Sequence, residues 1–200
     1  AGTISGNQNI CEGQTTTFSS NGDAGGVWSS SNTSIATVSS SGLVTGVSSG
    51  TATITYTVVG AGGCADATAT RTVTVTAPPN AGVLSGNQDI CEGQTTTFTS
   101  NGDAGGVWSS SAETIATVNS SGVVTGVSAG TATITYFVAG TGGCADDKTT
   151  RTVTVTAPPN AGVLSGNQDI CEGQTTTFTV SGNSATGVWS SSNTSIATVN

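Results

Sequence analysis

The chain has 200 residues and a formal net charge of −8, with three Lys or Arg residues and no histidine. An acidic chain with so few cations is a poor partner for nucleic acid or for an anionic membrane surface. Aromatic residues make up 4% and charged residues 7% of the chain, while glycine occurs 29 times. This composition favours several small β-rich cores over one large apolar core. No apolar run approaches the ~20 residues that a membrane span needs, so we expect no membrane-embedded segment.

Short strands separated by turns are predicted along the first part of the chain. The alternation of apolar residues with threonine or serine has the period of a half-buried strand, and no stretch has a helical period. The predicted strands cover residues 14–20, 25–31, 34–40, 42–48, 51–58 and 71–76. In the longest, Ala52, Ile54 and Tyr56 share one face with Val58. About seven short strands predict an all-β fold, a small antiparallel sandwich.

The same pattern then repeats. Residues 1–80 and 81–160 align without a gap and are identical at 64 of 80 positions, and residues 161–200 begin a third copy with one extra residue before its tryptophan. A fixed period of this length predicts an array of like domains. We therefore expect modules at residues 1–77 and 81–157, an incomplete module at 161–200, and proline linkers at 78–80 and 158–160. Each copy has one tryptophan, expected in its core: Trp28, Trp108 and Trp189.

The central half of each copy resembles a known family. The stretch VWSSSNTSIATVSSSGLVTGVSSGTATITYTV, from Val27 to Val58, is similar to group 2 bacterial immunoglobulin-like domains. It recurs at residues 107–138 and in part at 188–200. The resemblance implies tandem immunoglobulin-like sandwiches of about seven strands in an extracellular bacterial rod or stalk, often an adhesive one, whose modules act as spacers.

The cysteines are regularly spaced, which indicates an oxidising compartment. Cys11 and Cys64 are 53 residues apart, as are Cys91 and Cys144 (64 − 11 and 144 − 91). We expect a disulfide within each module, Cys11 with Cys64 and Cys91 with Cys144, each worth ~4 kcal/mol by the chain-entropy argument. Cys171 would pair beyond the chain end, near position 225. Buried free thiols are the alternative; zinc is disfavoured because histidine and Cys-x-x-Cys spacing are absent.

The sequence offers little for catalysis or for cofactors. Without histidine there is no Ser–His or Cys–His pair, so we expect no enzyme. Asp146 and Asp147 are adjacent and would point to opposite faces of a strand, which excludes a carboxylate dyad. Calcium is the metal that the sequence could support, because three acidic residues recur between copies. None of them lies in a dense acidic loop. We therefore interpret them as surface acids and predict no cofactor. These acids are Glu12, Asp23 and Asp66, repeated as Glu92, Asp103 and Asp146.

The predicted function is a structural repeat segment of an extracellular bacterial surface fibre or adhesin stalk, which projects an adhesive element away from the cell. Its expected partners are neighbouring repeats of the same chain or fibre, and a glycan or surface ligand at a distal tip. The alternative is a module that itself binds glycan or host protein through loops such as residues 21–26, or one that is accessory to a secreted enzyme. We also expect a longer repeat chain around these residues; the competing hypothesis makes Asn200 a true terminus, with strands donated by a neighbouring subunit.

Overall fold

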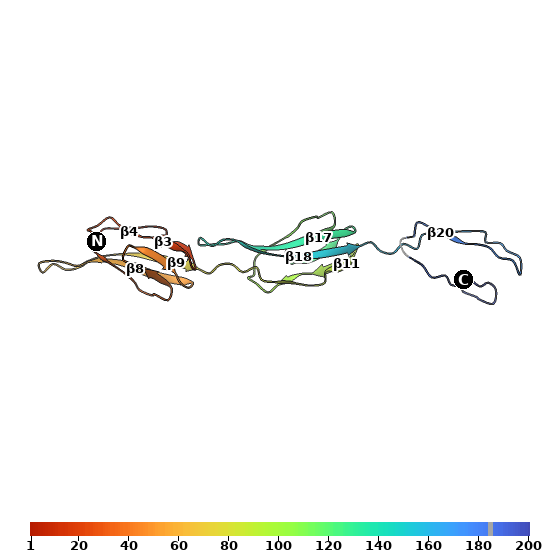
Figure 1. The fold of residues 1–200 in the computed structure, drawn as a ribbon, viewed down its shortest axis with the longest axis horizontal. Coiled ribbons are helices and arrows are strands. Elements are labelled where there is room, and N and C mark those ends of the chain that lie inside the picture. The colour runs from red at the N-terminus through yellow and green to blue at the C-terminus, as the bar shows by residue number, and fades with distance from the viewer. Residues whose placement is uncertain (184–185) are drawn as a thin grey trace.

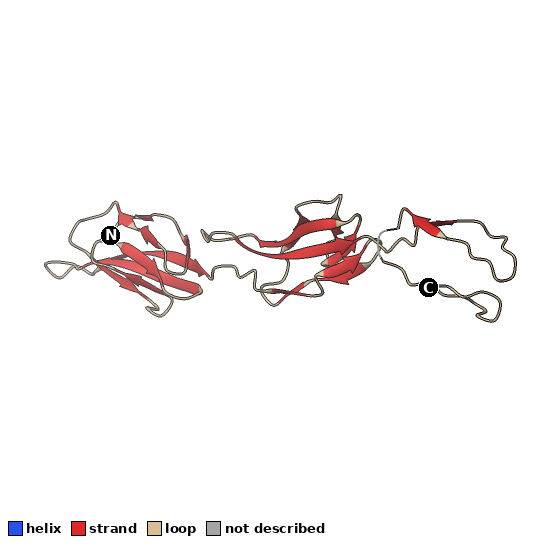
Figure 2. Cartoon of the chain, turned by 45° about the vertical axis from the view of Figure 1, so that its right-hand side comes forward, coloured by secondary structure: helices blue, strands red, loops and turns tan. Residues whose placement is uncertain are grey.

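The computed structural model describes residues 1–183 and 186–200, and it shows an elongated molecule in which the repeats follow one another end to end (Figure 1). All regular elements of the described residues are strands, as Figure 2 shows by colour. Residues 184 and 185 lie in the stretch that carries the extra residue of the third copy, and that stretch is thus only partly within the described residues.

The first module has nine strands. They are β1 (Ile4–Ser5), β2 (Asn9–Cys11), β3 (Thr15–Thr17), β4 (Ser19–Ser20), β5 (Val27–Ser30), β6 (Ala36–Val38), β7 (Leu43–Gly46), β8 (Gly50–Val58) and β9 (Ala67–Thr76). A four-stranded sheet of order β2-β9-β8-β5 and a three-stranded sheet of order β3-β7-β6 form the sandwich, and β1 pairs with β4. Counting the interrupted pairs β1/β2 and β3/β4 as one strand each leaves the seven that the sequence predicts.

The second module repeats this arrangement. Its strands are β10 (Leu84–Ser85), β11 (Asp89–Cys91), β12 (Thr95–Thr97), β13 (Thr99–Ser100), β14 (Val107–Ser110), β15 (Ala116–Val118), β16 (Val123–Gly126), β17 (Gly130–Val138) and β18 (Asp147–Thr156). The sheets have the orders β11-β18-β17-β14 and β12-β16-β15. The third copy contributes one described pair, β19 (Val163–Ser165) with β20 (Thr179–Ser181).

The core of each module lies between the two larger sheets. Ala52, Ile54 and Tyr56 of β8 are buried, which confirms the face predicted from their alternation. Phe18, between β3 and β4, is 1% exposed and belongs to the same core cluster. The threonines of β8 face the threonines of β9 on the outer side, in register from Thr51↔Thr74 onwards. Threonine suits this half-buried position because its branched side chain fits a pleated surface and stays soluble without charge.

The tryptophans, predicted in the core, border it in the two complete modules. Trp28 and Trp108 are only partly buried and pack against the edge of the core. The ring of Trp28 lies 4.7 Å from that of Tyr56 on the neighbouring strand, and Trp108 repeats this contact with Tyr136. Trp189, in the third copy, is 42% exposed.

The short strand β2 near the start of the first module runs parallel to β9, the last strand of that module. This pairing determines where the cysteine of β2 lies. β2 pairs in parallel with the end of β9, in the register Ile10↔Val75 and Cys11↔Thr76. The residues that end β2 therefore lie beside the residues that lead into the linker. We call this end of a module its exit end, and the opposite end, which carries the β8–β9 or β17–β18 turn, its turn end.

Candidate functional site: the junction between modules

The structure joins the two complete modules by a disulfide as well as by the linker. Cys11 of the first module is bonded to Cys144 of the second, with a Cα–Cα distance of 4.8 Å. The predicted pairs Cys11–Cys64 and Cys91–Cys144 are therefore wrong. Cys64, Cys91 and Cys171 are free and exposed. We call the Cys11–Cys144 bond the junction disulfide.

The reason for the correction is the direction of the strands. Cys11 lies beside Thr76, the last residue of β9, whereas Cys64 lies shortly before Ala67, the first. The ten residues of β9 span about 30 Å at the usual rise of a strand. A disulfide needs Cα atoms within about 7 Å, so the two cysteines of one module cannot meet. The regular spacing of the cysteines is real, but it connects opposite ends of one module.

The exit end of the first module holds Cys11 in a tight turn. Gln14 N donates a hydrogen bond to Cys11 O at 3.0 Å, and Glu12 N donates to Thr76 O at 2.9 Å. The carboxylate of Glu12 accepts a hydrogen bond from Ser49 N at 2.6 Å. Cys11 is 6% exposed, so the bonded sulfur is covered on the side of the second module.

The turn end of the second module presents Cys144 to this exit end. The turn is built on Gly142 and Gly143, which have φ values of +62° and +89°, in the left-handed region that favours glycine. Cys144 N donates to Thr141 O at 3.0 Å. Asp146 closes the base of the turn, where its Oδ1 accepts a hydrogen bond from Gly140 N at 2.8 Å.

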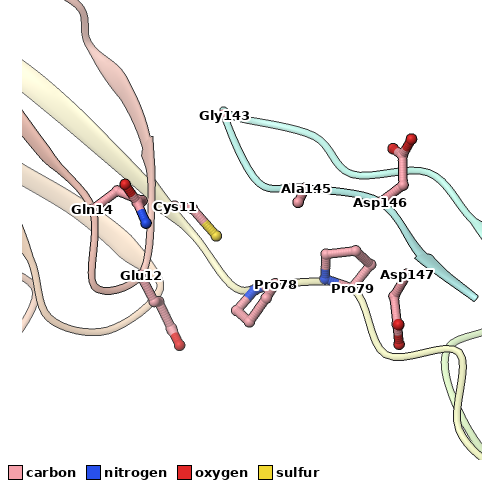
Figure 3. A pocket seen from close by; sticks show the side chains of 9 residues that line it. All are labelled: Cys11, Glu12, Gln14, Pro78, Pro79, Gly143, Ala145, Asp146 and Asp147. Atoms are coloured by element: carbon pink, nitrogen blue, oxygen red, sulfur yellow. The ribbon is translucent and has the colours of Figure 1, made fainter.

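The turn packs closely on the first module. A Cβ atom added to Gly142 would lie 2.1 Å from the Thr76 side-chain oxygen, so only glycine fits there without a shift. The Cys144 sulfur lies 3.4 Å from Thr76 O. Figure 3 shows the Cys11 sulfur pointing from one module toward the Gly143 loop of the other, with Pro78 and Pro79 passing beneath.

Around these contacts is a groove of about 560 Å³ between the modules. It is lined by Cys11, Glu12, Gln14, Pro78, Pro79, Gly143, Ala145, Asp146 and Asp147. Both covalent connections therefore border the same space.

The linker is also fastened to the second module just beyond its prolines. Asn80 N donates to Asp103 Oδ2 at 2.8 Å, and Asp103 N donates back to Asn80 O at 2.7 Å. Ala81 N donates to Asp147 Oδ2 at 2.7 Å. The prolines cannot donate hydrogen bonds and have a restricted φ, so the connection between Thr76 and Asn80 is short and stiff.

The acidic residues that suggested calcium serve instead as acceptors for turn amides. Glu92 Oε1 accepts from Ala129 N at 2.7 Å, and Asp66 Oδ1 accepts from Gly60 N at 2.9 Å. Asp23 takes part through its main chain, where its carbonyl accepts from the Tyr56 hydroxyl. Asp146 and Asp147 bind different amides, as described above. Across residues 1–183 and 186–200, no three metal-ligating side chains come together.

One arginine in each complete module binds main-chain carbonyls of that module, and no role was predicted for either arginine from the sequence. Arg71 donates from its guanidinium to Ile4 O at 3.1 Å and to Gly6 O at 2.7 Å, and its guanidinium carbon lies 5.7 Å from the centre of the Phe18 ring. Arg151 makes the same contacts in the second module. Alternation along the strand could have indicated that Arg71 points inward, because Arg71 lies two residues before the buried Val73 and shares its face of β9.

The two complete modules are thus immunoglobulin-like β-sandwiches in tandem, cross-linked at their junction. Residues 12–69 and 69–149 match the bacterial Ig-like domain (group 2). The chain belongs to this family, as the resemblance predicted.

A curated relative is Ice-binding protein 1 of Shewanella frigidimarina (strain NCIMB 400), which is 32% identical over 195 residues. The match covers 86% of this chain and 21% of the relative, so the chain spans about a fifth of that protein.

Several solved structures match the chain at lower identity. The S-layer protein rSbsC(31-844) is 22% identical, with 76% of this chain and 25% of that chain covered and a TM-score of 0.30. Murine CEACAM1b is 14% identical, with 78% and 100% covered and a TM-score of 0.44. A Ca²⁺-stabilized adhesin that helps an Antarctic bacterium bind ice is 18% identical, with 84% and 52% covered and a TM-score of 0.40. Nowhere in the described residues is there a helix with the length and apolar character to cross a membrane.

Proposed function

We propose that this chain is a spacer segment of an extracellular bacterial surface fibre or adhesin stalk, which holds an adhesive element away from the cell. The observation that carries the proposal is the double covalent connection between consecutive modules, through Pro78–Pro79 and through the junction disulfide. A single-chain linker, even a short one, leaves two domains able to pivot about it. The second connection fixes the turn that carries Cys144 to the exit end of the first module, and this opposes the pivoting and favours a rod.

The disulfide also supports the location. Disulfides persist in oxidising surroundings such as the cell exterior and are reduced in the cytosol of most bacteria. The relation to Ice-binding protein 1 supports a place in a much longer protein, in which the segment would act as spacer. The carboxylates of Glu12 and Asp146 bind main-chain amides, which supports a structural role for these two acids.

Small-angle scattering tests the spacer. The two complete modules, residues 1–160, should give one extended end-to-end distance when oxidised, because the disulfide and the linker together restrain their junction. Reduction, or the double variant Cys11→Ser/Cys144→Ser, should broaden the distance distribution toward shorter values. Cys64→Ser is the matched control, since Cys64 is free, and it should scatter like the parent chain. A parent chain that bends as freely as the double variant would contradict the proposal.

The cellular part of the proposal needs a separate measurement. Antibodies against the modules should label intact cells of the bacterium that makes the protein, and external protease should remove the label. Labelling that requires permeabilised cells would contradict a surface fibre.

The alternative is a module that binds glycan or host protein, and binding of the oxidised chain to a glycan array tests it. The exposed apolar side chains of the two modules are aliphatic, and even the neighbouring Val27 and Val59 are only two valines. Binding surfaces are usually contiguous apolar patches of several hundred Å², which a few exposed valines do not form. We therefore expect no binding, and saturable binding by the oxidised chain would favour the alternative.

A further inference from the structure

Cys91 occupies in the second module the position that Cys11 occupies in the first. β11 pairs in parallel with β18 so that Cys91 is opposite Thr156, as Cys11 is opposite Thr76. Gln94 N donates to Cys91 O at 3.0 Å, which repeats the turn around Cys11. The surroundings differ in one respect: Cys11 is covered by the neighbouring turn, whereas Cys91 is exposed.

Cys64 in the same way repeats Cys144. It follows Gly62 and Gly63, whose φ values of +64° and +86° match those of the bonded turn. Cys64 N donates to Ala61 O at 3.2 Å, and Asp66 closes the turn on Gly60. The turn therefore has the bonded shape in a module whose turn end contacts no other module among the described residues.

The linker that follows the second module is also repeated. Residues 157–178 are identical to residues 77–98, so the chain leaves Cys91 and Thr156 through the same two prolines. A module that follows this linker with the same hydrogen bonds places its own β17–β18-type turn against the exit end of the second module. That turn carries the cysteine that repeats Cys144.

We propose that Cys91 is a cross-linking site, half of a second junction disulfide that is closed by the turn cysteine of the module that follows. Cys64 is the complementary half for a module that packs on the turn end of the first. Closure joins two thiols by one S–S bond and releases two protons and two electrons, which a disulfide-bearing oxidant accepts as it is reduced to two thiols. The fibre then has one disulfide at every junction, and each module contributes one cysteine to the junction at each of its ends.

The two disulfides would interlock. Cys91 lies inside the segment that Cys11 and Cys144 enclose, so the second cross-link begins within the loop closed by the first. Each module is then held to both neighbours through cysteines at its opposite ends. A pairing within a module gives no such continuity, and the length of the strand between the two cysteines excludes it.

The test completes the third module with sequence from the second. Asn200 repeats Asn119, so residues 120–160 are appended after Asn200, which adds the cysteine that repeats Cys144. The chain is refolded in a glutathione redox buffer, free thiols are alkylated, and the disulfides are mapped by mass spectrometry without reduction. We expect Cys91 linked to the appended cysteine, Cys11 linked to Cys144, and alkylation at Cys64 and Cys171 alone.

The Cys91→Ser variant of this extended chain is the control. It should keep Cys11–Cys144 and leave the appended cysteine alkylated, because Cys171 lies at the opposite end of that module. A bond between Cys171 and the appended cysteine, in either chain, would overturn the proposal. So would full alkylation of Cys91, or loss of the Cys11–Cys144 bond on which the proposal is patterned.

Discussion

Cys11 and Cys144 are 133 residues apart in the chain, yet their Cα atoms lie 4.8 Å apart across the boundary between two modules. The disulfide between them is a covalent path that bypasses the main chain from Glu12 to Gly143. Tension applied to the two ends of the chain passes from Cys11 directly to Cys144. The segment between them, from Glu12 to Gly143, carries none of it while the bond is intact.

Single-molecule stretching should show this shielding. With Ala1 and Asn200 attached to handles, the oxidised chain cannot release the segment from Glu12 to Gly143, whereas reduction frees it. At about 3.3–3.6 Å per extended residue, reduction should add about 450 Å of contour length. The Cys11→Ser/Cys144→Ser variant should show this length without reductant. An equal contour length before and after reduction would contradict the cross-link.

The junction disulfide should also stabilise the modules thermally. Closing a loop of 133 residues stabilises the folded state by about 5 kcal/mol in the chain-entropy treatment, and the two modules share this stabilisation. Cys144→Ser should therefore lower the Tm measured by calorimetry, and Cys64→Ser, at the repeat-equivalent free cysteine, should leave it unchanged. Equal effects of the two substitutions would mean that the bond contributes nothing to stability.

The sequence predicted the all-β sandwich well because alternation along a strand is a local signal. The inward face of β8, with Ala52 and Ile54 buried, follows from alternation between successive residues. The family resemblance covered the strands from Val27 to Val58, and the structure forms them there.

The cysteine pairing was missed because it depends on geometry between distant residues. The regular spacing of the cysteines is compatible with a bond inside a module and with one between modules. Only the parallel pairing of β2 with β9 shows that Cys11 and Cys64 lie at opposite ends. Trp28, predicted in the core, is partly buried and packs against the core cluster, whereas Phe18 is almost fully buried within it.

Arg71 should be a strong contributor to the stability of the first module. Its guanidinium donates to two carbonyls of the first strand segment and lies over Phe18. Hydrogen bonds from a charged group contribute ~1.5–3 kcal/mol. Arg71→Met should lower the urea unfolding free energy by about that amount. Arg71→Lys should lower it by less, because an ammonium group keeps a charged donor but lacks the planar fork that reaches both carbonyls. Lys148→Met, at an exposed lysine, is the control and should be near neutral.

Removal of calcium should leave the oxidised chain unchanged. Glu12 and Asp146 are engaged with main-chain amides, and the described residues hold no group of three metal ligands. An ion that binds only the folded state raises the free energy of unfolding with the logarithm of one plus its concentration over its Kd. The Tm in excess EDTA should therefore equal the Tm in millimolar calcium. A fall of several degrees in EDTA that calcium reverses would show a site formed by these residues.

Gly142 and Gly62 provide a matched pair that separates the junction from the turn itself. Their φ values are +62° and +64°, so alanine at either position meets the same backbone strain, about 1–2 kcal/mol. An added Cβ would meet the Thr76 side chain at 2.1 Å from Gly142, and nothing within 4 Å from Gly62. Gly142→Ala should therefore push the turn away from the first module, whereas Gly62→Ala should not affect the junction.

The measurement is the equilibrium between Cys11–Cys144 and its two thiols in glutathione buffers of known ratio, followed by alkylation. The extra methyl group of Gly142→Ala overpacks the contact with Thr76, which costs about 1–3 kcal/mol. The junction disulfide should therefore be roughly five- to 140-fold easier to reduce, since about 1.4 kcal/mol corresponds to tenfold in an equilibrium constant. Gly62→Ala should match the parent chain, because its strain lies at the far end of the first module. Identical reduction curves for both variants would mean that the packing of Gly142 on Thr76 does not hold the two cysteines together.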